Sequence, residues 1–207
     1  MNKLALLLTA PLWLTLSNPA TAATEHKARA QSNFTLDGSL LQLSDRQLPQ
    51  QLKGAAVHYQ FQYAPKVQFE LAFKAAEADQ DGRSQQYRRY YLDSSYQLLS
   101  FPAAFKCECT AGLMLRVGHE KYQGVVNDSH ALYGAGFYSR GTLLPGFYSE
   151  TKFGYQDDTA EGALSRRGWF LDYQLSYEIN HRADIYLNYQ RQYDQHSTGL
   201  GISIRFF

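Results

Sequence analysis

Cysteine is scarce in this sequence, which excludes a fold built on a disulfide framework. Only Cys107 and Cys109 occur among 207 residues, and a single residue separates them. A bridge between them would close a very small, strained ring, and one bridge does not make a framework. The pair also lacks neighbouring His or Cys residues that could complete a metal site. We predict that the two cysteines are structural or incidental, and that the protein has no metal and no cofactor.

A charge excess and long apolar runs are also missing. The formal net charge is +1, which gives no reason to expect nucleic acid as a partner. After residue 22 no apolar stretch approaches the roughly 20 residues that a membrane-spanning helix needs. The chain beyond that point is therefore either an exported soluble protein or a closed barrel that crosses a membrane with strands.

The first residues have the composition of a secretory signal peptide. Lys3 precedes an apolar run from Leu4 to Leu16, and residues 20–22 provide the small side chains that a signal peptidase recognises. The run is too short for a spanning helix. We therefore assign residues 1–22 to a cleaved signal peptide, residues 23–32 to a short N-terminal periplasmic segment and residues 33–207 to one domain.

Apolar and polar residues alternate along the mature sequence, which indicates β-strands. In residues 169–179 the odd positions are all Trp, Leu, Tyr or Ile, and the even positions are mostly polar. Residues 57–63 and 67–73 repeat the pattern with three residues between them, which predicts a tight hairpin. We predict ten strands, at residues 33–43, 55–63, 67–76, 88–98, 110–119, 130–140, 147–156, 169–179, 183–192 and 198–207. The fourth and fifth are the least regular, and losing that hairpin would leave eight strands.

Connections of two lengths alternate between these strands. Polar segments at 44–54, 77–87, 120–129, 156–168 and 193–197 form the longer set. The other set, at 64–66, 102–109, 142–146 and 180–182, is generally shorter. A transmembrane barrel has this asymmetry, with brief periplasmic turns and longer outer loops, and an even strand number leaves both termini in the periplasm.

The last nine residues, 199–207, run Gly-Leu-Gly-Ile-Ser-Ile-Arg-Phe-Phe. This segment resembles the final strand of small Gram-negative outer-membrane β-barrel proteins, such as the OmpA/OmpX-like and omptin-like barrels, which usually ends on Phe. In that family the barrel assembly machinery recognises the final strand. The resemblance therefore implies an assembly signal at Phe206 and Phe207 and a location in the bacterial outer membrane. Phe207 departs from the pattern, because the apolar face ends at Phe206.

Alternation alone leaves open which row of side chains faces water. A soluble barrel places its apolar row inside, whereas a membrane barrel places it outside. Strands of about ten residues match a tilted membrane strand better than a typical globular strand. Aromatic residues near strand ends, such as Tyr63 and Trp169, fit the interfacial girdles of membrane barrels. The sequence therefore predicts an all-β fold, an up-and-down antiparallel transmembrane β-barrel of about ten strands, with eight as the fallback.

The polar row of such a barrel would fill its lumen. The charged lumen candidates are Glu70, Lys74, Arg89, Asp93, Arg116, Arg140, Glu150, Lys152, Asp172, Glu178, Asp184 and Arg205. A barrel of eight to ten strands is narrow enough to be filled by side chains, and unpaired buried charges are unfavourable, so we expect these residues to pair.

The expected role is structural or surface-interacting. The expected partners are outer-membrane lipid, lipopolysaccharide and the assembly machinery, and the sequence identifies no extracellular partner. A narrow, porin-like passive pore for small solutes is the alternative.

A hydrolase at the outer rim is a second alternative, although the main expectation is no catalytic residue. Asp79-Gln80-Asp81 and Asp194-Gln195-His196 resemble in part the acidic and Asp/His pairs of the omptin proteases, which face each other across an outer cleft. Such groups could position and deprotonate a water. The resemblance gives Asp79, Asp81, Asp194 and His196 as candidates, and His196-Ser197 is a partial likeness to lipid A deacylase barrels. Three further histidines, at 58, 119 and 130, have no clustered partner in the sequence and are predicted to be polar fillers or rim residues.

Overall fold

The structure is a computed structural model, and it describes residues 34–46, 48, 51–80, 83–101, 109–124, 126–160 and 167–206. The predicted signal peptide and periplasmic segment, residues 1–22 and 23–32, lie outside these residues. No helix in the described part of the chain is long and apolar enough to cross a membrane.

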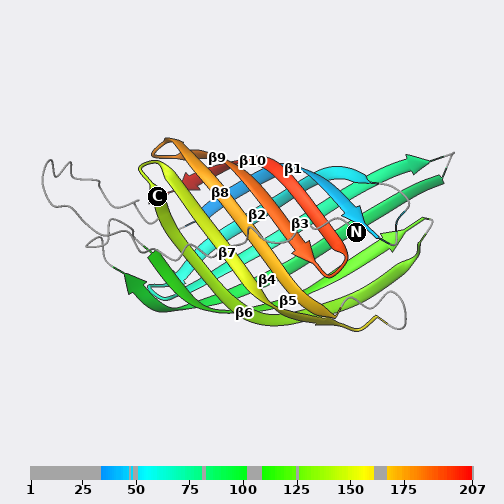
Figure 1. Cartoon of the computed structure of the whole chain (residues 1–207), viewed down its shortest axis with the longest axis horizontal. Coiled ribbons are helices and arrows are strands. Elements are labelled where there is room, and N and C mark those ends of the chain that lie inside the picture. The colour runs from blue at the N-terminus through cyan, green and yellow to red at the C-terminus, as the bar shows by residue number, and fades with distance from the viewer. Residues whose placement is uncertain are drawn as a thin grey trace, which may run out of the picture.

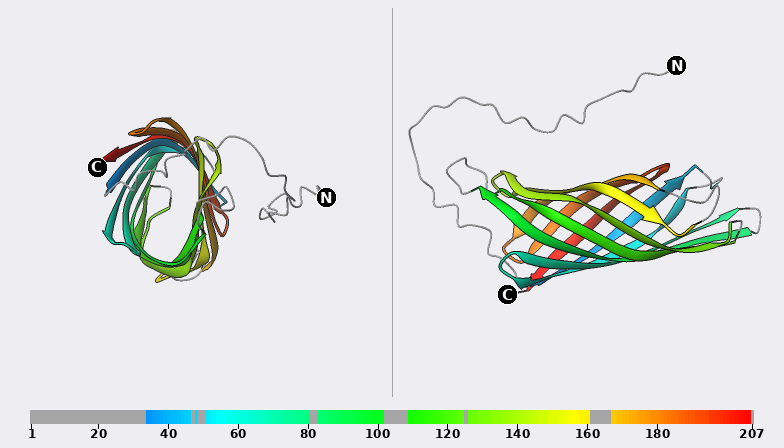
Figure 2. Two further views of the ribbon diagram at one scale, coloured as in Figure 1. Left: turned by 90° about the vertical axis from the view of Figure 1, so that its left-hand side faces the viewer. Right: turned by 90° about the horizontal axis from the view of Figure 1, so that it is seen from below.

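Ten antiparallel strands form one closed barrel (Figure 1; Figure 2, left). Each strand pairs with its neighbours in sequence, and the first strand pairs with the last from Phe34↔Phe206 to Asp45↔Gln195. The strands are β1 Phe34–Asp45, β2 Leu52–Ala64, β3 Val67–Gln80, β4 Arg83–Phe101, β5 Cys109–Gln123, β6 Asp128–Leu144, β7 Phe147–Asp158, β8 Gly168–Asn180, β9 Ala183–Gln192 and β10 Gln195–Phe206. The prediction of an up-and-down barrel with ten strands is confirmed, and the fallback of eight is wrong.

The two ends of the barrel differ in their connections. At the terminal end, where β1 begins and β10 ends, the strands are joined by two-residue turns at 65–66, 145–146 and 181–182 and by a seven-residue connection at 102–108. At the opposite end, called the loop end, the connections are 46–51, 81–82, 124–127, 159–167 and 193–194, of which 159–167 is the longest. The turn at 145–146 is Pro-Gly, and Gly146 has a φ of 79°, the conformation that favours glycine at this position of a tight turn.

Two segments predicted as outer loops are largely strand. β3 and β4 stay paired to Gln80↔Arg83, and β9 and β10 stay paired to Gln192↔Gln195. The apolar row ends before these pairs, so the sequence no longer alternates apolar with polar although the backbone remains extended. As a result the β3–β4 hairpin projects at the loop end (Figure 1).

The apolar row faces outward and the polar row faces inward. Leu40 and Leu115 expose 76% and 63% of their surface, whereas Arg116 and Glu120 expose none. Large exposed apolar side chains occur on all ten strands. The core of this protein is therefore the lumen, and it is mostly polar. Cys109 at the start of β5 is disulfide-bonded, and Cys107 lies outside the described residues.

Candidate functional site

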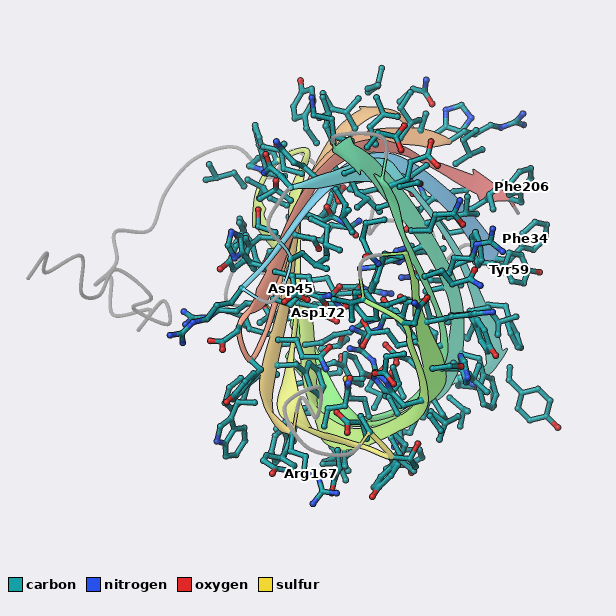
Figure 3. The ribbon with its side chains drawn as sticks, turned by 90° about the vertical axis from the view of Figure 1, so that its right-hand side faces the viewer. Phe34, Asp45, Tyr59, Arg167, Asp172 and Phe206 are labelled. Atoms are coloured by element: carbon teal, nitrogen blue, oxygen red, sulfur yellow. The ribbon has the colours of Figure 1, made fainter. Side chains whose placement is uncertain are left out.

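The twelve charged residues predicted for the lumen all lie on the inward row. Eight are buried and four are half-buried, the latter being Arg140, Glu150, Asp172 and Glu178. Strand alternation explains this placement, since each lies an even number of residues from another inward residue on its own strand. Asp172 points into the lumen when the barrel is viewed from the loop end (Figure 3).

Arg116 on β5 joins two other strands at the centre of the lumen. Its Nε and Nη2 donate to the two carboxylate oxygens of Asp93 at 2.7 and 2.8 Å, and Nη2 also donates to Asp172 Oδ2 at 2.7 Å. The guanidinium lies 4.3 Å from the ring centre of Tyr91 and 4.6 Å from that of Phe170. The ion pairs with two carboxylates and the contacts with two aromatic faces together offset the cost of removing this guanidinium from water.

Lys152 on β7 extends this cluster toward β3. Its Nζ lies 2.6 Å from Glu70 Oε2 and 3.0 Å from Asp93 Oδ2. Because Asp93 contacts both cations, the residues Glu70, Asp93, Arg116, Lys152 and Asp172 form one connected set, called here the central ion-pair network. It ties β3, β4, β5, β7 and β8 together inside the barrel.

Further polar contacts cross the lumen on both sides of this network. Toward the loop end, Arg89 donates to Gln156 Oε1 at 2.9 Å and to Gln192, and Lys74 donates to Gln190. Toward the terminal end the contacts are Arg140 Nε to Glu150 Oε2 at 2.8 Å and Arg205 Nη2 to Asp184 Oδ1 at 2.7 Å, while Glu178 Oε2 accepts from Tyr148 at 2.7 Å.

An apolar cluster in the lumen was not predicted. It consists of Leu41, Leu43, Leu48, Leu52, Ala56, Ala76, Tyr87 and Tyr122. Leu48 belongs to the connection after β1, so the cluster lies at the loop end. Leu40 and Leu41 are adjacent in sequence, and alternation alone does not reveal that Leu41 points inward while Leu40 faces out.

The terminal end of the lumen contains a cavity of about 200 Å³. Its walls include Gln60, Gln68, Arg140 and Glu150, and the β2–β3 turn residue Lys66 lines its rim. A smaller cavity of about 40 Å³ lies among residues of the central ion-pair network, including Glu70 and Lys152.

Sequence reasoning missed four buried carboxylates in the lumen, those of Asp37, Asp45, Glu120 and Asp158. Asp37 lies within the first predicted strand and alternates with its inward residues, so the period of the strand could have identified it. The other three lie beyond the predicted strand ends. The lumen therefore contains more acidic than basic side chains, whereas the sequence predicted a near balance.

The three histidines thought to be isolated have partners. His58 Nδ1 lies 3.2 Å from Glu70 Oε1. His130 lies between Glu120 Oε2 at 3.2 Å and Asp128 Oδ2 at 2.7 Å. His119 faces outward and stacks on Tyr90, with ring centres 5.2 Å apart. Asp128 lies two residues before His130 on β6, whereas Glu70, Glu120 and Tyr90 lie on neighbouring strands and are brought to their histidines by the register.

The hydrolase candidates do not form a cleft in the described structure. Asp79 on β3 and His196 on β10 are exposed on the outer wall, and β1 and β2 separate their strands. Asp194 lies in the β9–β10 turn, where its Oδ2 is 3.7 Å from Nη1 of Arg46. Asp81 lies outside the described residues. Among the described residues no group of three or more His, Cys, Asp or Glu is placed to hold a metal ion.

The final strand presents its apolar row to the outside. Leu200, Ile202, Ile204 and Phe206 are all exposed. Phe206 stacks on Phe34, with ring centres 4.8 Å apart, and Tyr59 continues the aromatic row across β2 (Figure 3). Phe207 lies outside the described residues.

Comparisons with known proteins return outer-membrane barrels of low similarity. No family model and no curated protein matches the chain. Among solved structures, a bacterial polysaccharide outer membrane secretin has a TM-score of 0.44 and 13% identity, over 84% of this chain and 66% of the secretin. Ail, the attachment invasion locus protein of Yersinia pestis, has a TM-score of 0.39 and 9% identity, over 84% of this chain and 97% of Ail. The NanC porin has a TM-score of 0.42 and 9% identity, over 84% of this chain and all of NanC. At these levels the function has to be inferred from the residues of this chain.

Proposed function

We propose that this protein is an integral barrel of the bacterial outer membrane, with a lumen sealed by its own side chains and a structural or surface-interaction role at the cell surface. The central ion-pair network carries this proposal. Its residues reach across the lumen from five strands and pair with one another, so they occupy the space through which a solute would pass.

The outer wall supports a membrane location. Soluble monomers rarely expose a continuous apolar surface beyond a few hundred Å². Here exposed Leu, Ile, Val, Phe, Tyr and Trp side chains encircle the barrel on all ten strands. Hydrocarbon is the solvent that such a surface fits, and a closed barrel leaves no unpaired strand edge inside it.

The central ion-pair network and the apolar cluster at the loop end both fill the lumen, with different chemistry. Together they support a closed rather than a conducting lumen. An ion that reached the central ion-pair network would have to displace hydrogen bonds of 2.6–3.0 Å. An ion at the loop end would meet the apolar cluster around Leu43 and Leu52, which are 2% and 0% exposed. An ion would lose hydration at both places, where it would meet charges already paired with one another or apolar side chains.

The connections favour an orientation with the terminal end in the periplasm. Three of the four connections at that end are two-residue turns, and the longest connection between the strands, 159–167, lies at the other end, as is usual in outer-membrane barrels. The final strand would then present its apolar row to the barrel assembly machinery, and the loop end would face the outside of the cell.

Two measurements on the outer-membrane fraction test this function. The unboiled protein should migrate differently from the boiled protein in a detergent gel, because a folded membrane barrel resists detergent until heated. The same folded protein should give no discrete conductance steps in a planar bilayer. Recovery in periplasmic extract without detergent would contradict the membrane location, and steady single-channel steps would favour the passive pore instead.

A further inference from the structure

Two like charges lie directly opposite each other on the outer wall. Arg88 on β4 pairs in register with Lys121 on β5, and both side chains are exposed on the lipid-facing row. Like charges at directly opposed positions of a sheet are destabilising. An anion that lay over both cations would remove this repulsion.

No acidic side chain of the described residues supplies that anion. The other register neighbours of the pair are Ala75 beside Arg88 and Ser129 beside Lys121. Within the described ranges, Arg88 donates one side-chain hydrogen bond, to the amide oxygen of Gln86 at 3.5 Å, and neither Arg88 nor Lys121 forms an ion pair. By contrast, Lys53 at the same end of the wall lies opposite Glu77, an arrangement of opposite charges.

The depth of the pair indicates which anion would cover it. The next outward pair toward the terminal end is Tyr90↔His119, whose rings stack 5.2 Å apart at 9°. The pair after that is Leu92↔Val117, within the apolar row. Two residues of strand span about 6.6 Å along a strand that tilts by about 35–45°, so the pair lies about 5 Å beyond the aromatic edge of the apolar wall along the barrel axis. Aromatic side chains lie at the interface with the headgroups, so the cations lie at headgroup level.

We propose that Arg88 and Lys121 bind a phosphate of an outer-leaflet lipid headgroup, as in lipopolysaccharide, with His119 and Ser129 beside the site. His119 Nε2 and Ser129 Oγ lie 3.2 Å apart and provide further polar groups next to the cations. A guanidinium and an ammonium on adjacent strands offer the donor geometry that phosphate oxygens accept. This inference rests on the outer-membrane location proposed above, and it goes beyond it by naming a lipid site on one face of the barrel.

The test measures binding of hexa-acylated lipid A with both phosphates to the full folded protein in detergent, by native mass spectrometry. A basic residue near an anionic lipid surface contributes about a fivefold effect on affinity. Lys121→Gln should therefore weaken binding about fivefold, and Arg88→Gln with Lys121→Gln about 30-fold. The matched control Lys53→Gln removes a lysine from the same outward row and should stay within about twofold of the unchanged protein.

Two further measurements use dephosphorylated lipid A as the ligand and inorganic phosphate as a competitor. The double variant should bind dephosphorylated lipid A as the unchanged protein does, and inorganic phosphate alone should not compete at the concentration of the lipid. Unaltered binding by the double variant, an equal loss in Lys53→Gln, a loss toward the dephosphorylated lipid, or full competition by inorganic phosphate would each overturn the proposal.

Folding and membrane location are checked separately from lipid binding. Each variant is first run unboiled and boiled on a detergent gel. If the unchanged protein shows no heat-dependent mobility, the proposed membrane function fails. If the variants keep that mobility and the double variant still binds phosphorylated lipid A normally, only the lipid site fails.

Discussion

At the scale of single residues, the interior depends on partners that face each other across the lumen. Arg116 is fully buried and donates three hydrogen bonds to Asp93 and Asp172. Alternation within β5 was enough to predict that Arg116 points inward. Its pairing with Asp172, 56 positions away in sequence, follows from strand order and barrel closure, which no local pattern encodes. The sequence could therefore supply the members of the central ion-pair network and not its connections.

Replacing Arg116 with Met should strongly destabilise the barrel. The change leaves the Asp172 carboxylate without its only salt-bridge cation among the described residues. Breaking a buried pair by removing one partner lowers the free energy of unfolding by about 3–5 kcal/mol. Urea unfolding in detergent micelles would measure the loss. Arg182→Met, at an exposed position in the β8–β9 turn, should change the value by less than about 0.5 kcal/mol. If Arg116→Met lowers the free energy of unfolding by less than about 1 kcal/mol, the ion pairs of Arg116 contribute little to the stability of the barrel.

A glycine inside the barrel wall provides a steric test. A Cβ on Gly154 would lie 2.3 Å from the backbone oxygen of Ala135 and 2.9 Å from the ring of Phe170. Phe170 in turn lies against the guanidinium of Arg116. Gly154→Ala should therefore lower the free energy of unfolding by about 1–3 kcal/mol, as overpacking does. Gly38 on the outward row has nothing within 4 Å of a Cβ, so Gly38→Ala should not destabilise the same urea transition. Equal effects of the two substitutions would contradict the packing described.

At the scale of the strand, the existence of each element could be predicted better than its ends. Period-two alternation identified all ten strands, including the irregular β4 and β5. It ended early in β3 and β4, because toward the loop end the outward face carries polar residues such as Glu77 and Gln86, while apolar Ala76 and Tyr87 face the lumen, so the outward-apolar pattern is lost. Main-chain pairing continues there, although no outward apolar pattern in the sequence indicates a strand. The inward leucines of β1 were missed for the related reason that adjacent apolar residues make the phase of the alternation ambiguous.

Strand β5 allows the lipid-facing assignment to be tested by depth. Leu115 lies mid-strand on the outward row and is 63% exposed, whereas Gln123 ends the same row at the loop end. An arginine at the midplane of a bilayer destabilises a membrane barrel by about 2–4 kcal/mol, and near the interface by about 0–1 kcal/mol. Leu115→Arg and Gln123→Arg should show this difference when urea unfolding is measured in phospholipid vesicles.

The same pair of substitutions separates a membrane barrel from a soluble one. On a surface in contact with water, both arginines would be solvated and would change stability by no more than about 0.5 kcal/mol. Two small and similar effects in vesicles would therefore contradict the lipid contact of the β5 outer face.

At the scale of the whole molecule, closure depends on the first and last strands meeting along their full length. β1 and β10 pair over twelve positions, from one end of the barrel to the other. These strands are separated by almost the entire described chain, so closure is a pairing of very distant segments and should form late in folding. It also removes both edges that an open sheet would leave exposed to other chains.

The last residues should matter more for assembly in cells than for stability. Phe206 contributes one aromatic stack, with Phe34, at the terminal end of this seam. Replacing Phe206 and Phe207 with Ala removes that stack, which is worth about 1 kcal/mol, and leaves the other register pairs of β10 in place. The purified variant should therefore refold in detergent with its heat-dependent mobility, while its amount in the outer-membrane fraction falls. Phe147→Ala is the matched control, because it removes another terminal-end aromatic pair, Phe147 with Tyr177, whose rings are 4.8 Å apart. If the control loses outer-membrane protein to the same extent, the effect is one of stability, and the terminal phenylalanines are not an assembly signal.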